Sequence, residues 1–153
     1  MFRKIKKEPD EGGGLFRKIL SRWKASAART VSTAIGEGTS SPHQVHGEVL
    51  EVLRYHRGAV LTLSWHPSLP SAAMVPEVAA ELQRYLDLAL DHVEANPEFK
   101  EDVLKFSGIF PIDVYWGRED CDFVIGFAFV GWDDGILSFF FRDGEVVDTD
   151  VSD

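Results

Sequence analysis

Apolar residues alternate with polar or small residues along the second half of the chain, a period of two that is typical of β-strands. The pattern predicts strands over 112–116, 123–130, 136–142 and 145–151. Two acidic turns, Asp133-Asp134-Gly135 and Asp143-Gly144, are expected to connect the last three as a meander. Within 123–130 one side of the strand carries only large apolar residues and the other mostly small ones. We expect a helix to pack closely on the small-residue side.

A hairpin is predicted earlier in the chain, with strands over about 48–54 and 59–65 around the loop Tyr55-His56-Arg57-Gly58. The second strand has the clearer alternation, whereas the first is ambiguous. Ser41-Pro42-His43-Gln44 could equally open a helix as a capping sequence. Gly47 and several β-branched residues weaken that helix, so the strand is the preferred interpretation.

Helical spacing of apolar residues marks three further segments. A long helix is predicted over 76–95, where it ends at Asn96-Pro97, and a shorter one over 98–106. Near the amino terminus, residues 15–35 carry an apolar stripe with Lys and Arg mostly off it. These segments predict four parts: a flexible lead (1–14), a basic amphipathic helix (15–36), a hinge (37–44) and an α+β domain (45–153).

The predicted fold class is therefore α+β. An antiparallel sheet, made of the N-terminal hairpin and the C-terminal four-strand meander, packs on one long and one short helix. The N-terminal basic amphipathic helix precedes this body.

Charge is segregated between the two parts. Residues 1–36 hold nine Lys or Arg and three acids, whereas 37–153 hold seven and twenty-two, within a net charge of −9. The acidic body is expected to repel phosphate, which argues against nucleic acid as a partner. The single Cys121 excludes an intramolecular disulfide framework, and no run of 18 apolar residues predicts a membrane span. We therefore expect a cytoplasmic protein.

Candidate catalytic and metal-binding residues do not form recognisable motifs. Five histidines, His43 and His46 among them, lack the ligand pattern of a zinc site, so no metal is predicted. Cys121 stands between Asp120 and Asp122, which should raise the pKa of its thiol and disfavour a nucleophilic thiolate. No cofactor-binding motif is present either, and the expected protein is not an enzyme. A small hydrolase remains an alternative that would need a converging polar cluster.

Acidic residues instead gather at the predicted turns, two of which are flanked by Trp. In a meander alternate turns share one end of the sheet, so the 117–122 loop and the 143–144 turn should lie together, with Asp133-Asp134 at the other end. Acidic turns with exposed aromatic anchors suit a basic protein partner. The predicted partner-binding residues are Trp116, Glu119, Asp120, Asp122, Trp132, Asp133, Asp134 and Asp143.

The basic segment has its own candidate roles. An apolar stripe under a Lys/Arg face is typical of a helix lying on an anionic membrane surface, which would make the protein peripheral. The same pattern suits docking into a partner groove, or packing back on the acidic body of the chain. The residues predicted for a membrane or partner helix are Phe16, Arg17, Lys18, Ile19, Leu20, Arg22, Trp23 and Lys24, within residues 15–35.

The order of elements, together with the stretches Val114-Tyr115-Trp116, Gly131–Gly135 and Phe141–Gly144, weakly resembles small acidic α+β immunity-type proteins of bacteria and related uncharacterised domains. This resemblance implies a non-catalytic role in which acidic loops block a partner. The preferred hypothesis is thus a bacterial protein-interaction module, and the alternative is a membrane-surface or assembly adaptor localised by residues 15–35.

Overall fold

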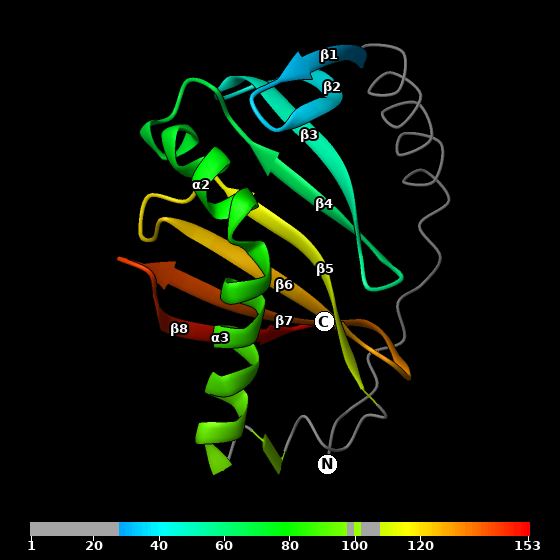
Figure 1. Ribbon diagram of the computed structural model, residues 1–153, viewed down its shortest axis with the longest axis vertical. Helices are drawn as coiled ribbons and strands as arrows, with labels where there is room; N and C mark the ends of the chain where they lie inside the picture. Colours follow the sequence, from blue (N-terminus) through cyan, green and yellow to red (C-terminus); the bar gives the residue numbers. More distant parts are fainter. Residues whose placement is uncertain (1–27, 98–99, 102–107) are drawn as a thin grey trace, which may run out of the picture.

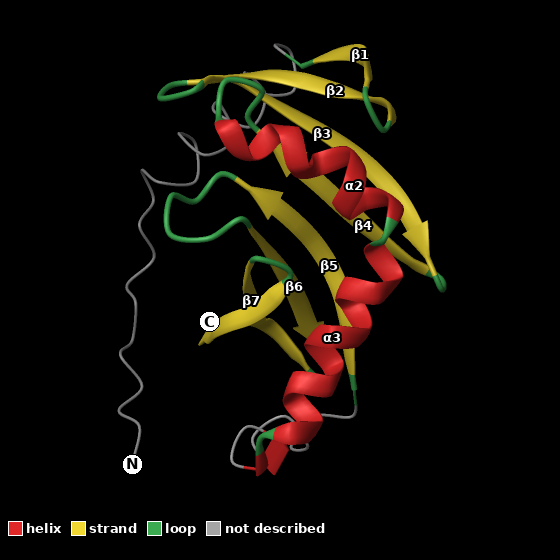
Figure 2. Ribbon diagram, turned by 60° about the vertical axis from the view of Figure 1, so that its left-hand side comes forward, coloured by secondary structure: helices red, strands yellow, loops and turns green. Residues whose placement is uncertain are grey.

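A single open sheet of eight strands, covered on one face by helices, forms the body of the protein in the computed structural model (Figure 2). The structure describes residues 28–97, 100–101 and 108–153. Four strands precede the helices and four follow them (Figure 1). The fold class is therefore α+β. None of the helices in these described ranges is long and apolar enough to cross a membrane.

The strands lie in the sheet in the order of the chain, from β1 to β8. All neighbouring strands are antiparallel except β4 and β5, which are parallel. The helices form the crossover that returns the chain over one face of the sheet to the start of β5. The first four strands are β1 (Arg29–Thr33), β2 (Gly36–His43), β3 (Gly47–His56) and β4 (Ala59–Trp65). The connection holds a 3₁₀ turn η1 (Pro70–Met74), α2 (Val75–Ala80) and α3 (Leu82–Ala95). The last four are β5 (Ile109–Trp116), β6 (Phe123–Phe129), β7 (Trp132–Arg142) and β8 (Glu145–Ser152).

Strands β1 and β2 correct the sequence interpretation of residues 29–44. The amphipathic helix predicted over 15–36 is wrong from Arg29 onward, and the hinge predicted over 37–44 is a strand paired with β3. Three of the five residues in β1 are β-branched, which favours a strand over a helix. Gly36, with φ of +121°, supplies the turn into β2. The predicted lead (1–14) and the rest of the predicted helix (15–27) lie outside the described residues.

Most of the other predicted elements are confirmed. The predicted first strand of the hairpin, 48–54, lies within β3, residues 45 and 46 belong to the turn before it, and β4 has the predicted bounds. The hairpin between them turns only at Arg57-Gly58, both with positive φ, as does the predicted Asp143-Gly144 turn. The long helix is interrupted at Glu81, which separates α2 from α3. The short helix predicted over 98–106 lies largely outside the described residues.

One predicted turn and one predicted packing face are wrong. Asp133, Asp134 and Gly135 lie within β7, and the chain turns earlier, at Val130-Gly131, where the glycine has φ of +93°. The helices pack on the large apolar side of β6, not on its small side. Tyr85 of α3 meets the ring of Phe123 edge-on at 5.1 Å. Large side chains bury more apolar area against a helix, and this determines the face.

The core lies between the helices and this Phe-rich face. Its most deeply buried side chains come from the central strands and include Leu61, Leu63, Val114, Trp116, Ile125, Phe127, Leu137, Phe139 and Phe141. The opposite face, which we call the outer face, carries the alternate residues of each strand and no described helix (Figure 2). At its centre the Asp113 carboxylate lies over Gly126, where an added Cβ would come within 2.2 Å of Asp113 Oδ1. The small residues of β6 therefore make room for side chains of the sheet itself.

Candidate functional site

The acidic residues predicted near the loop before β6 do meet at one end of the sheet. The 117–122 loop and the turn at Asp143-Gly144 are neighbours, since the Asp143 backbone N–H donates to Asp122 Oδ2 at 2.8 Å. Arg142 also donates to the backbone carbonyl of Asp120. We call this region, with the adjoining outer face of β7 and β8, the acidic end.

Arg118 organises the loop of the acidic end. Its guanidinium donates two hydrogen bonds to the Asp120 carboxylate, at 2.8 and 2.6 Å, and lies 4.7 Å from the centre of the Phe140 ring. The hydrogen bond from Arg118 lowers the pKa of Asp120 to about 2, and its carboxylate raises the pKa of Arg118 in return. The pair is exposed to solvent, so it fixes geometry more than it adds stability.

A cavity of about 290 Å³ opens beside this ion pair. Phe140 and Val147 form its apolar part, and its other lining residues are Arg118, Asp120, Asp148, Thr149 and Asp150. Three carboxylates therefore face one guanidinium, which Asp120 already engages through both oxygens. Within the described residues, Asp148, Asp150 and the nearby Glu119 form no ion pair. The cavity has the chemistry to accept a cationic side chain whose methylene groups rest on the apolar part.

The structure separates the predicted partner-binding residues into three groups. Glu119, Asp120, Asp122 and Asp143 lie at the acidic end. Asp133 and Asp134 are exposed at the start of β7, next to the Val130-Gly131 turn at the opposite end of the sheet. The two Trp residues are not exposed anchors, and their prediction as contact residues is not supported by this placement.

Trp116 and Trp132 both belong to the interior. Trp116 is 0% exposed, and its indole N–H has no acceptor among the described residues. Trp132 is half-buried, with its ring stacked on Phe129 at 5.3 Å and folded over Gly135. The apolar contact groups of the acidic end are instead Phe140 and Val147. The period-two pattern already places Phe140, Asp148 and Asp150 on one face, a signal that turn-based reasoning missed.

Cys121 lies within the same loop but is buried. Burial is the larger cause of the raised pKa of its thiol, and the charge of Asp120 adds to it. Both effects favour the protonated thiol, so Cys121 is a poor nucleophile. The predicted direction is confirmed, although sequence reasoning attributed it to the neighbouring charges alone.

A cluster of three histidines lies on the same outer face, at the ends of β2, β3 and β4 and beside Tyr115 of β5. The rings of His43, His46 and His66 lie 4.5–5.2 Å apart, centre to centre. His66 is only 2% exposed. Its Nδ1 lies 3.0 Å from the Glu48 carbonyl, which can only accept, so Nδ1 carries the proton and Nε2 accepts from the Tyr115 hydroxyl at 3.1 Å. His43 Nδ1 accepts from the backbone N–H groups of Val45 and His46.

These hydrogen bonds direct both ring nitrogens of His66 and the Nδ1 of His43 to the backbone and to Tyr115. Among the described residues, no group of three or more His, Cys, Asp or Glu side chains is arranged to hold a metal ion. The histidine cluster therefore serves to close the ends of β2, β3 and β4 against one another.

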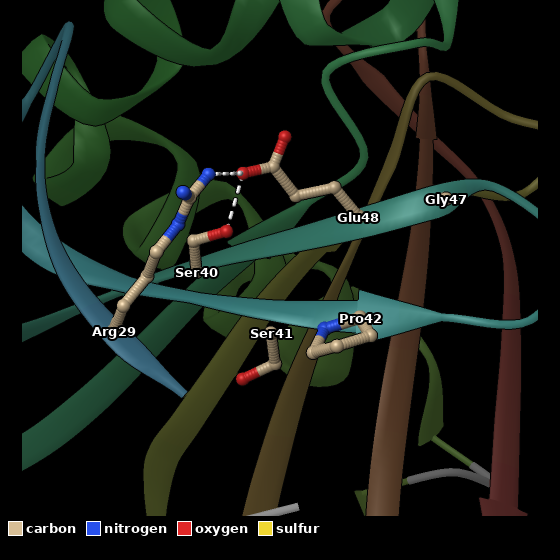
Figure 3. A pocket seen from close by; sticks show the side chains of 6 residues that line it. All are labelled: Arg29, Ser40, Ser41, Pro42, Gly47 and Glu48. Atoms are coloured by element: carbon tan, nitrogen blue, oxygen red, sulfur yellow. Dashed lines mark hydrogen bonds and ion pairs between the residues drawn. The ribbon is translucent and has the colours of Figure 1, made fainter. Parts of the chain in front are cut away.

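A second cavity, of about 390 Å³, lies between β2 and β3 on the helix side of the sheet (Figure 3). The buried Ser40 hydroxyl donates to the Glu48 carboxylate, and Arg29 approaches the same oxygen at 3.8 Å. A hydroxyl acting as a nucleophile needs a base that is in turn oriented by a third group. The third group here is the guanidinium of Arg29, which approaches the same carboxylate oxygen from β1. This arrangement ties the edge strands together.

The residues predicted for a membrane or partner helix, Phe16 to Lys24, lie outside the described residues. Strand β1 begins at Arg29, so no helix extends to residue 35 as the sequence interpretation had it. The acidic end thus remains the region whose chemistry most resembles a binding site. No protein-family model, curated protein or solved structure matches the chain, so a function has to be argued from this geometry.

Proposed function

We propose that this protein is a non-enzymatic interaction module that binds a basic protein partner through its acidic end. The observation that carries the proposal is the cavity beside Phe140, where Asp120, Asp148 and Asp150 face the single Arg118. A Lys or Arg side chain of the partner would enter this cavity, because three carboxylates attract it and Phe140 with Val147 receive its methylene groups. An immunity-type or inhibitor-like role, which the sequence resemblance implies, fits a surface of this kind.

Preorganisation supports the same proposal. The loop is held by the bonds from Arg118 to Asp120, from Arg142 to the Asp120 carbonyl and from the Asp143 amide to Asp122. A surface that is already ordered loses less conformational entropy when it binds. The carboxylates of Glu119, Asp143, Asp148 and Asp150 are not engaged in these bonds and are left to meet a partner.

The test compares two variants with the same change of charge. The acidic-end variant carries Glu119→Gln, Asp148→Asn and Asp150→Asn. The control variant carries Asp91→Asn, Asp133→Asn and Asp134→Asn, which remove three exposed acids elsewhere. Proteins captured from a host lysate by wild type, acidic-end variant and control are identified by mass spectrometry.

The proposal expects basic proteins that wild type and control both capture and that the acidic-end variant fails to capture. Removing one member of a charged pair at a buried interface typically weakens binding by about 2–5 kcal/mol, and removing a charge at the rim weakens it by less. The same set of partners on all three baits, or a loss of partners that the control shares, would contradict it.

A further inference from the structure

The outer face of the sheet has an exposed apolar patch far from the acidic end. Leu53 and Tyr55 of β3 are 68% and 87% exposed. Val60 of β4, which pairs with Tyr55, is 47% exposed. Strand alternation turns these three side chains away from Val52 and the helices. Three large apolar neighbours on an uncovered face are typical of a contact surface.

A groove of about 340 Å³ adjoins this patch across β1, β2 and β3. Its lining residues are Thr30, Glu37, Gly38, Thr39, Glu51 and Leu53. Neither Glu37 nor Glu51 forms an ion pair with a described residue. The groove and patch together therefore suit an occupant that offers both cations and apolar side chains.

We propose that the occupant is the chain's own basic segment, residues 16–24, docked on the outer face of β1–β4. This segment holds the cations Arg17, Lys18, Arg22 and Lys24 without any acid, and the apolar residues Phe16, Ile19, Leu20 and Trp23. Its cations would pair with Glu37 and Glu51, and its apolar residues would cover Leu53, Tyr55 and Val60. The charges of the two sets are opposite in sign, and both sets offer large apolar side chains.

The connection to β1 makes this docking geometrically easy. Five residue steps separate Lys24 from Arg29, the first residue of β1, and an extended chain spans at most about 17 Å over five steps. Strand β3 lies two strand spacings from β1, which is about 10 Å. A short tether also gives the segment a high effective concentration at the groove, of millimolar order.

Other occupants fit the charge less well. A second copy of this face would bring its own Glu37 and Glu51 against the first pair, and an anionic membrane would meet the same two carboxylates. Like charges brought together at an interface oppose association. Residues 2–7 are also basic, but residues 16–24 hold more apolar side chains and lie nearer to β1 along the chain.

Disulfide trapping in the full-length chain tests the proposal. With Cys121→Ser as background, Leu20→Cys is combined either with Leu53→Cys in the patch or with the control Asp91→Cys on α3. We expect intramolecular cross-linking of the Leu53 pair to be at least about tenfold faster, because tethered partners in contact have the higher effective concentration. Adding Glu37→Lys and Glu51→Lys should slow it to the control rate.

Footprinting with hydroxyl radicals provides a second readout that needs no engineered cysteines. Docking predicts that labelling of Leu53 and Tyr55 rises several-fold in the Glu37→Lys/Glu51→Lys variant, while labelling of Val45, an exposed residue of the β2–β3 turn, stays constant. Unchanged labelling of Leu53 and Tyr55 would overturn the proposal.

The remaining outcomes assign the surfaces differently. Cross-linked dimers in place of intramolecular products would show that the outer face binds a second copy of the chain. Equal cross-linking rates for the Leu53 and Asp91 pairs, together with flotation of the wild type on phosphatidylserine vesicles, would show that the basic segment binds a membrane. Either result overturns the docking of residues 16–24 on their own sheet.

Discussion

A half-buried carboxylate, Asp113, makes the stability of this sheet depend on pH. Burial raises the pKa of Asp113, and a hydrogen bond from the backbone of Gly126 opposes the shift only in part. The folded state therefore binds this proton more tightly than the unfolded state. As the pH rises through the ordinary value of 3.8 and the raised folded value, this group costs stability, and the cost persists at neutral pH.

Asp113→Asn is expected to stabilise the fold at pH 7, because the amide oxygen can keep the hydrogen bond from Gly126 without a buried charge. Below pH 3.8, where both states are protonated in the wild type, the gain should disappear. Urea denaturation at the two pH values measures this, with Asp91→Asn as an exposed control. A variant that is less stable than wild type at pH 7 would show that the charge itself is needed.

Tyr115 and His66 form the second residue-scale feature, a hydrogen bond between a hydroxyl and a buried imidazole. Tyr115→Phe leaves the Nε2 of His66 without its donor, which we expect to cost about 1–3 kcal/mol of unfolding free energy. Tyr55→Phe removes a hydroxyl from a ring that is almost fully exposed and should cost close to nothing. Equal unfolding midpoints in denaturant for the two variants would contradict the assigned role of the hydroxyl.

At the scale of elements, alternation predicted β3 to β7 because each of these strands buries apolar side chains on one face. Strand β8 has no fully buried residue, and the Asp143-Gly144 turn predicted it instead. Strand β2 was missed for a physical reason. Ser40 is its only buried residue and the strand is otherwise polar or small, so the sequence carries no alternation of apolar residues there. The β1 region was misread since Val31 and Ile35 continue the helical spacing of the segment before them. Strand β1 pairs with β2, and β2 pairs with β3. The local sequence pattern does not show such pairing between strands.

The same limit explains the candidate site. Turn positions located Glu119, Asp120, Asp122 and Asp143 correctly, because hairpin connectivity follows from local sequence. Burial of Trp116 depends on which face the helices cover, and that is a tertiary property. The Phe140 cavity likewise requires Arg118 to cross from the loop onto the sheet.

Two deletions test where the folded domain begins. Deleting residues 1–28 tests the observed start at β1, and deleting residues 1–44 tests the predicted start after the hinge. The shorter deletion ends just before β1, keeps every described strand and helix, and should leave a folded monomer. The longer one removes β1 and β2 and exposes the edge of β3, with its neighbouring Leu53 and Tyr55, so we expect aggregation in size-exclusion chromatography. A stable monomer after the longer deletion would mean that the two strands are an accessory.

At the scale of the whole molecule, the basic and acidic parts compete electrostatically for any charged partner. Residues 1–28 carry eight Lys or Arg and three acids, so their removal changes the net charge from −9 to −14. If the acidic end binds a basic partner, this change should speed association at low salt, because attraction between opposite charges raises on-rates more than it alters the contacts. We expect the on-rate of an arginine-containing peptide to increase several-fold in stopped-flow mixing. The difference in on-rate should vanish at high salt, where the screening length falls to about 3 Å.

The charge of the acidic end can be tested separately in the deleted chain. Asp148→Asn with Asp150→Asn should cancel most of the gain in on-rate although the basic segment is absent. An on-rate that is insensitive to both changes would show that the peptide binds elsewhere, and that segregation of charge along this chain does not guide its partner to the acidic end.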